Sequence, residues 1–403
     1  MEKTRLGLQT LRFGALLSFA LLWAATASAQ VELVRKSEAN GQSQAISDYG
    51  FRYQIDLETN PVCNQGKTGT CWSFSSVGFL ESEYLRKEKS SIDLSEMYVV
   101  RKVYEDKAEK YLRMHGTIAF AQGGALPDML YVLREYGMMP ETAYPGRPNP
   151  AEGFDHSELE SALKGLLDAV LKAEGKSLSQ TWQSGVQALL DAYLGAVPET
   201  FEYEGKRYTA RTFADQKLKL KAEEYVQITS FTHRPEGTWM AIEVPDNWLW
   251  DRSFNVSLEG MMKTLNRALD AGMSVGWATD VSEKSFAVRK GLAVCPDPEW
   301  LKTHPEATGF EFQCPERTID PALRQLGYDR WETTDDHGML ITGKAQAADD
   351  RVFYLVKNSW GEIENPVRPG YLMASEAFVE YKTISMLLPV EALSKEDRKK
   401  AGL

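Results

Sequence analysis

The sequence predicts an α+β protein of two packed lobes, in which a mostly helical first half is followed by a mostly β second half. Apolar residues recur with helical spacing up to about residue 225, and strand-like patterns dominate after it. The 403 residues suffice for two or three domain-sized units, and 43% hydrophobic with 26% charged residues is an ordinary globular composition. The formal net charge of −11 argues against nucleic acid or an anionic membrane as a partner.

The first 29 residues have the pattern of a signal peptide. Basic Lys3 and Arg5 precede an apolar run over residues 13–25, and the small residues 27–29 allow cleavage before Gln30. The run is shorter than the roughly 20 residues that a spanning helix needs, so a retained membrane anchor is the weaker interpretation. We therefore expect an exported protein, periplasmic or secreted, that does not contact the membrane after cleavage.

Composition and turn signals divide the chain into further segments. We expect a polar N-terminal arm lying on the surface, a helical lobe, a mainly helical insertion, a β lobe and a charged tail. These segments cover residues 30–60, 61–145, 146–235, 236–390 and 391–403.

Periodicity gives the expected elements of each segment. Helices are expected over residues 71–89, 95–112, 125–136, 157–173, 184–194, 217–224 and 258–271. A hairpin is expected over residues 200–209, and strands over 225–231, 239–244, 273–278, 337–344, 351–358 and 371–374.

Four cysteines are too few for a disulfide scaffold, so each needs its own explanation. Cys295 and Cys314 lie in one Pro-rich region, and the sequence leaves open whether they form a disulfide bond in an oxidising compartment. Cys63 is interpreted as a buried thiol. A bridge between Cys63 and Cys71 would remove the reactivity that the residues around Cys71 indicate.

Cys71 has the surroundings of a nucleophile. A loop with two glycines, over residues 65–70, delivers it to the first turn of a predicted helix. The helix dipole and the unpaired backbone N–H groups there stabilise a thiolate, which is the reactive form. The side-chain amide of Gln65 and the Cys71 N–H could together hold an oxyanion. Taken alone, a cysteine at a helix start is more often structural.

His337 is the candidate base among five histidines, the other four of which are interpreted as surface or core residues. It opens a predicted strand, and Gly338 behind it allows close approach. A second strand ends at Asn358, so adjacent antiparallel strands would bring the Asn358 carbonyl beside the His337 ring. Asn358 then fixes the tautomer while the other ring nitrogen takes the thiol proton, and Trp360 shields that hydrogen bond from water.

These motifs resemble the papain-like cysteine peptidases: Gln65 with Cys71-Trp72-Ser73-Phe74, His337-Gly338-Met339, and Asn358-Ser359-Trp360-Gly361. The resemblance implies a papain-like two-lobed fold with an antiparallel, barrel-like β lobe and catalysis by Cys71, His337, Asn358 and Gln65. A further match, Gln122-Gly123-Gly124, implies that Gly123 and Gly124 line the substrate cleft with Trp72 and Trp360. In that family the second glycine hydrogen-bonds the substrate backbone.

The bleomycin hydrolase or aminopeptidase C branch is the best match. Only about 30 residues separate the signal peptide from the motif loop, and a large helical insertion lies between the two halves. Thr68 stands where papain-type members usually have a disulfide-forming cysteine, which agrees with this branch. The resemblance implies a peptide substrate, a hexamer, and a C-terminal arm in the cleft that restricts cleavage to free amino termini. The tail of this chain is shorter than that arm, which leaves the aminopeptidase specificity open.

Three other functions stay open on this sequence: an endopeptidase with an open cleft, a transferase using the same residues, and a non-catalytic binding protein on the same fold. The sequence implies neither a metal nor an organic cofactor, because no His, Cys and Asp residues have ligand spacing. The pairs Asp335-Asp336 and Asp349-Asp350 are interpreted as solvated turn residues.

Overall fold

The computed structural model describes residues 49–149, 151–174, 177–305, 307, 312 and 314–403. The expected signal peptide and most of the N-terminal arm therefore lie outside the described residues. In the described part of the chain, no helix has both the length and the apolar composition that crossing a membrane requires.

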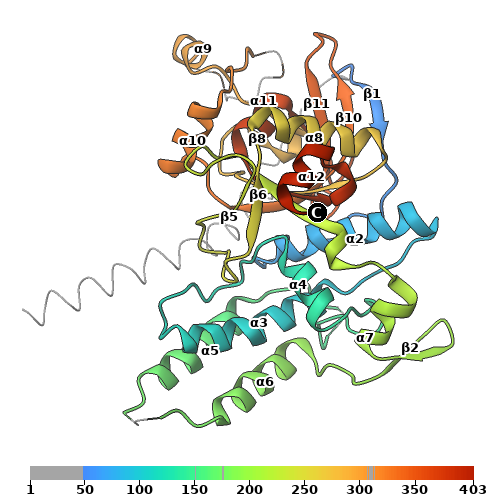
Figure 1. The fold of residues 1–403 in the computed structure, drawn as a ribbon, viewed down its shortest axis with the longest axis vertical. Helices are drawn as coiled ribbons and strands as arrows, with labels where there is room; N and C mark the ends of the chain where they lie inside the picture. Colours follow the sequence, from blue (N-terminus) through green and yellow to red (C-terminus); the bar gives the residue numbers. More distant parts are fainter. Residues whose placement is uncertain (1–48, 150, 175–176, 306, 308–311, 313) are drawn as a thin grey trace, which may run out of the picture.

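The helical lobe is built around α2, which begins at Cys71 and lies between the rest of this lobe and the β lobe (Figure 1). The helices expected between residues 71 and 194 are confirmed, with ends shifted by a few residues. The lobe contains α2 (Cys71–Glu88), α3 (Glu96–Arg113), α4 (Asp128–Glu135), α5 (Ser157–Leu171) and α6 (Thr181–Leu194).

The insertion shares a hydrophobic core with the helical lobe. Leu159, Leu163 and Leu167 are fully buried at a four-residue spacing on α5, and α6 buries one face in the same way. Helix α6 packs against both α5 and α3 (Figure 1), so the segment extends the lobe rather than folding apart from it. The expected hairpin is confirmed as β2 (Phe201–Tyr203) and β3 (Lys206–Tyr208).

The helix expected over residues 217–224 is wrong. After α7 (Ala210–Phe213), the chain makes a π-helical turn, η1 (Ala214–Leu218), and then a 3₁₀ turn, η2 (Ala222–Glu224). Lys219 has a left-handed backbone conformation (φ +58°), which ends the helix. The charged composition alone could not predict this stop.

The β lobe is one mainly antiparallel sheet. Its described strands follow the order β5-β6-β4-β13-β7-β10-β11-β12-β9-β8, and β1 also pairs with β10. The strands are β1 (Arg52–Asp56), β4 (Tyr225–Thr229), β5 (Thr238–Ala241), β6 (Arg252–Asn255), β7 (Val275–Thr279), β8 (Phe286–Ala287), β9 (Leu292–Ala293), β10 (His337–Gln346), β11 (Val352–Lys357), β12 (Tyr371–Ser375) and β13 (Thr383–Pro389).

Two strands depart from the expectation. Part of the N-terminal arm forms a strand that was not predicted, β1, which pairs with β10 at the sheet. Strand β13 was missed, although all seven of its residues are buried between β4 and β7. The strand follows α11 at once, so no turn signal separates the two elements in the sequence.

Short helices cover the β lobe, and the tail packs against it. They are α8 (Leu258–Asp270), α9 (Pro298–Thr303), α10 (Pro321–Asp329), α11 (Glu376–Lys382) and α12 (Lys395–Ala401). Helix α12 lies on β5, where Trp239 Nε1 donates to the Ala401 carbonyl at 3.1 Å. Residues 395–401 therefore lie on the outside of the sheet.

No disulfide bond joins Cys63, Cys71, Cys295 or Cys314 in the structure. The segments around Cys295 and Cys314 pair antiparallel with Pro296 opposite Glu316, and the two thiols pack in different hydrophobic clusters. Cys63 is half-buried rather than buried.

Candidate active site

Cys71 is the first residue of α2 and is 2% exposed. The N-cap residue, Thr70, makes no side-chain capping hydrogen bond. The loop before it is held by Lys67, whose N–H donates to the Phe154 carbonyl at 2.8 Å. Gly66 has φ +60°, and a Cβ there would lie 2.4 Å from that same carbonyl oxygen, so only glycine fits. The start of the insertion thus fixes the loop that presents Cys71.

His337 and Asn358 come together through the pairing of β10 with β11. His337 Nε2 donates to Asn358 Oδ1 at 2.7 Å, and both residues are 3% exposed. This juxtaposition was predicted and is confirmed. Nδ1 is then the His337 nitrogen available to take a proton. The Trp360 ring lies over the imidazole with 4.6 Å between ring centroids, so it covers the hydrogen bond.

Gly338 brings the β lobe into contact with the first turn of α2. A Cβ at this position would lie 2.5 Å from Ser75 Oγ and 3.2 Å from the Cys71 carbonyl oxygen. No residue with a side chain could approach α2 so closely. As a result, Cys71 and His337 line the same cleft, whose empty volume is about 440 Å³.

The cleft favours the neutral forms of the Cys71 thiol and the His337 imidazole. Burial, with smaller contributions from the carboxylates of Asp335 and Asp246, raises the pKa of the Cys71 thiol to about 12. Hydrogen bonds from the backbone N–H groups of Gly338 and Trp72 act in the opposite direction. Burial also lowers the pKa of His337 to about 4, against the effect of its bond to Asn358. A thiolate therefore has to form by proton transfer to His337 rather than by loss to solvent.

Gln65 is buried beside the catalytic loop. Its Nε2 donates to the Thr68 carbonyl at 2.7 Å, and its Oε1 accepts from Ser359 Oγ at 2.6 Å. One amide hydrogen is thus committed to the loop, and Gln65 links the cysteine segment to the Asn358 segment. Its expected role toward an oxyanion depends on its second amide hydrogen.

The expected substrate-binding residues separate into two groups. Trp72 and Gly124 line the cleft, and Trp72 Nε1 donates to the Gln122 carbonyl at 3.0 Å. Gly123 and Trp360 do not line it: Asp246 covers Gly123, and the Trp360 ring lies against His337 at a tilt of 35°. Their assignment as substrate-binding residues stays a prediction.

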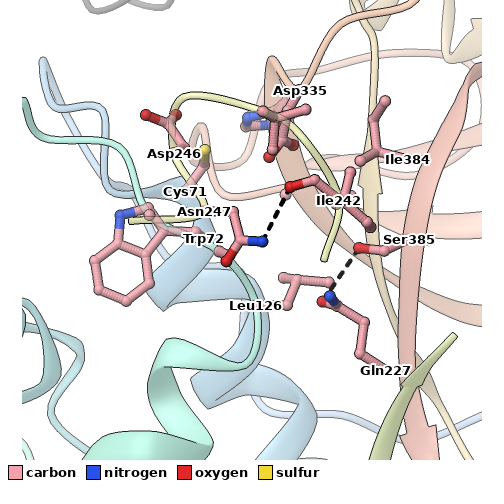
Figure 2. Close-up of a pocket in the computed structure, with 16 residues that line it drawn as sticks. Cys71, Trp72, Leu126, Gln227, Ile242, Asp246, Asn247, Asp335, Ile384 and Ser385 are labelled. Atoms are coloured by element: carbon pink, nitrogen blue, oxygen red, sulfur yellow. Dashed lines mark hydrogen bonds between the residues drawn. The ribbon is translucent and has the colours of Figure 1, made fainter. Parts of the chain in front are cut away.

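Two acidic residues in the cleft were missed. The interpretation of Asp335 as a solvated turn residue is wrong, because Asp335 is half-buried and lines the cleft with Asp246. In Figure 2 their side chains are seen on either side of Cys71. The position of Asp335, two residues before His337, was the available signal; nothing in the sequence marked Asp246.

Apolar side chains form much of the remaining cleft wall, including Leu126, Ile242 and Ile384 (Figure 2). In the described part of the chain, no three His, Cys, Asp or Glu side chains are placed to hold a metal ion. The arrangement can thus bind an apolar side chain beside a thiol and an imidazole.

A thiol at a helix start, with an imidazole and an amide from adjacent strands of a second lobe, defines a papain-like cysteine peptidase. The match to a model of the Peptidase C1-like family spans residues 20–401, so the chain belongs to this family.

Similar proteins agree with this assignment. Aminopeptidase C of Streptococcus thermophilus is 25% identical over 411 residues, covering 90% of this chain and 87% of the relative. Aminopeptidase C of Lactococcus lactis subsp. cremoris is 22% identical, covering 86% of this chain and 84% of the relative. The crystal structure of PepW from Lactobacillus rhamnosis HN001 superposes with a TM-score of 0.70 at 20% identity, covering 96% of this chain and 94% of that one. The fold is therefore papain-like and α+β, as predicted.

Proposed function

We propose that this peptidase is an aminopeptidase that removes residues from the free amino termini of peptides through a thioester on Cys71. The observation that carries the catalytic part is the 2.7 Å hydrogen bond from His337 to Asn358, because His337 lines the same cleft as Cys71. The relatives named aminopeptidase C support the specificity.

The chemistry follows from these groups. His337 Nδ1 takes the Cys71 proton as Sγ attacks the peptide carbonyl carbon, and the carbonyl oxygen becomes an oxyanion. The Cys71 N–H and the second amide hydrogen of Gln65 are its candidate donors. His337 then gives the proton to the leaving amine, which leaves a thioester. Water, deprotonated by His337, hydrolyses the thioester and restores the thiol.

Two peptides and one variant test this proposal. They are a peptide with a free amino terminus, its Nα-acetylated form, and the protein with Cys71→Ala. We expect stepwise loss of residues from the free peptide, little cleavage of the acetylated one, and loss of both activities in Cys71→Ala. Product mapping by mass spectrometry distinguishes the alternatives. Internal cuts in both peptides would indicate an endopeptidase, and transfer to an added amine would indicate a transferase. Full peptidase activity in Cys71→Ala would exclude the thioester route, and no cleavage by the wild type would indicate a binding protein.

We also propose that the chain is exported after cleavage before Gln30, on the basis of the pattern in residues 1–29. Amino-terminal sequencing of the mature protein from its native host should begin at Gln30. A mature protein that begins at Met1 would contradict export by this route.

A further inference from the structure

The loop over residues 242–251, between β5 and β6, crosses from the β lobe to the helical lobe. Trp248 on this loop is buried, and its Nε1 donates to Asp128 Oδ2 on α4 at 2.7 Å. Lys110 Nζ on α3 lies 4.2 Å from the centre of the Trp250 ring. Asn247 fixes the loop internally, donating to the Ile242 and Asp251 carbonyls at 3.0 Å each. The loop is therefore anchored at both lobes.

This anchored loop places Asp246 directly on Gly123. A Cβ on Gly123 would lie 2.1 Å from Asp246 Oδ2, so the carboxylate occupies the space above the glycine. Gly124, the next residue, still lines the cleft with Cys71. Asp246 itself lines this cleft, so a peptide lying along Gly124 meets its carboxylate. The loop thus forms this end of the cleft.

The carboxylates around this end lack a compensating cation in the cleft. Among the described residues, no side-chain hydrogen bond or ion pair engages Asp246 or Asp335. Lys107 attracts Asp246, but its Nζ is bound to the carbonyls of Ala121 and Gly123 behind the loop. Behind Gly124, Asp128 is 0% exposed and its Oδ1 has no partner among the described residues. Half-buried carboxylates that repel one another create a site that favours a cation.

We propose that Asp246 and Asp335 bind the α-ammonium group of the substrate, so that one residue lies between this group and the carbonyl carbon that Cys71 attacks. The inference rests on the proposed aminopeptidase function and names the groups that select the free amino terminus. The ammonium group is the one cation common to all such peptides. Residues 390–403 do not line the cleft, so the described tail does not supply this contact.

Binding of the ammonium group also assists the chemistry. The same two carboxylates raise the pKa of Cys71, and a bound cation offsets their charge. The thiolate is then favoured when a free amino terminus occupies the site, and disfavoured when a blocked peptide occupies it.

The proposal predicts that binding of a free-amine substrate depends on pH. Burial raises the pKa of Asp246 to about 6, against the attraction of Lys107, while Glu160 on α5 adds to the rise. Burial also raises the pKa of Asp335 well above its ordinary value, and the charges of Asp246, Asp336 and Asp128 add to the rise. Below pH 6, Asp246 gains a proton and loses its attraction for an ammonium group. KM for a free-amine substrate should therefore rise as the pH falls through about 6.

Asp246→Asn and Asp335→Asn test the proposal, with Asp350→Asn as a matched control. Asp350 is on the exposed turn between β10 and β11, and its side chain is 79% exposed. The substrates are leucine 7-amido-4-methylcoumarin and its analogue in which hydrogen replaces the amino group. We expect KM for the leucine substrate to rise about 10- to 100-fold in the two cleft variants, which is the usual range for losing a charged hydrogen bond. The rate on the analogue should stay the same or increase, and the control should match the wild type.

A second readout does not depend on substrate. Removing either carboxylate should increase the rate at which iodoacetamide alkylates Cys71, because the thiol pKa falls. A wild-type preference for the free amine that both variants retain, with unchanged alkylation rates, would overturn this inference alone. A wild type that hydrolyses both substrates equally would contradict the proposed aminopeptidase function instead.

Discussion

Of the two polar atoms of the Asn358 side chain, only the carbonyl oxygen makes hydrogen bonds to the described residues. Its Oδ1 accepts from His337 Nε2 at 2.7 Å and from the Ser359 N–H at 2.8 Å, while its Nδ2 is buried without a partner among the described residues. The carbonyl oxygen therefore determines the orientation and tautomer of the imidazole, and the amide nitrogen contributes no bond.

This asymmetry separates two substitutions of Asn358. Asn358→Ala frees the His337 ring and should lower kcat about 10²-fold, the usual cost of a misplaced catalytic group. Asn358→Asp keeps an acceptor but adds a negative charge, which raises the pKa of His337 above its lowered value. The acid limb of the kcat/KM profile should then move to higher pH. Wild-type profiles for both variants would show that Asn358 does not act on His337.

The site residues that could be predicted from the sequence belong to local sequence patterns, and those that could not be predicted do not. Cys71, His337 and Asn358 each belong to a short local pattern, so their roles could be predicted before any fold was known. Asp246 belongs to no pattern, because its place on Gly123 depends on a loop that reaches the other lobe. Only the packed structure brings such a residue to the cleft.

At the scale of elements, the contact between β10 and α2 determines how close the base comes to the nucleophile. Gly338→Ala would put a Cβ 2.5 Å from Ser75 Oγ and 3.2 Å from Trp72 Cα. We expect a loss of about 1–3 kcal/mol of unfolding free energy, as for other overpacked sites, and a lower kcat as His337 shifts.

Gly165→Ala is the matched control, since Gly165 lies within α5 and a Cβ there meets no atom within 4 Å. It should stabilise the protein by about 0.5–1 kcal/mol and leave kcat unchanged. Thermal or urea unfolding with parallel kinetics measures both effects. A Gly338→Ala protein with unchanged stability and kcat would contradict the close contact described above.

The predicted elements with a clear amphipathic period, such as α5 and α8, appear in the structure within a few residues of their expected ends. Strand β13 has no exposed face, and helix α11 precedes it directly, so no turn marked where the strand begins. Periodicity reports one-sided burial, and it fails where an element is buried on both faces.

At the scale of the whole molecule, buried acids lie where the lobes meet. Glu81 and Glu96 line a second cavity with Lys357, behind the strand that carries His337. Burial raises the pKa of Glu81 above its ordinary value, and Glu96 shifts in the same direction. The folded protein therefore holds protons that the unfolded chain releases above about pH 4.5. Loss of these protons therefore lowers the free energy of unfolding as the pH rises from about 4.5 through neutral.

Glu81→Gln should reduce this loss of stability at rising pH. The amide keeps an oxygen to accept the Leu94 N–H, a bond of 2.8 Å in the wild type, but has no proton to lose. The melting temperature of this variant should fall less than that of the wild type between pH 6 and 8. Glu88→Gln, at the exposed end of α2, should follow the wild type. An equal fall in all three proteins would show that Glu81 does not lose its proton in this range.

The central claim, that Cys71 is the nucleophile, is tested most directly by alkylation with less than one equivalent of iodoacetamide, followed by peptide mapping and activity measurement. We expect the label on Cys71, and a fraction of activity lost that equals the fraction of Cys71 modified. Cys63, Cys295 and Cys314 should remain unmodified at that point. A protein that keeps full peptidase activity with Cys71 completely alkylated would exclude Cys71 as the nucleophile.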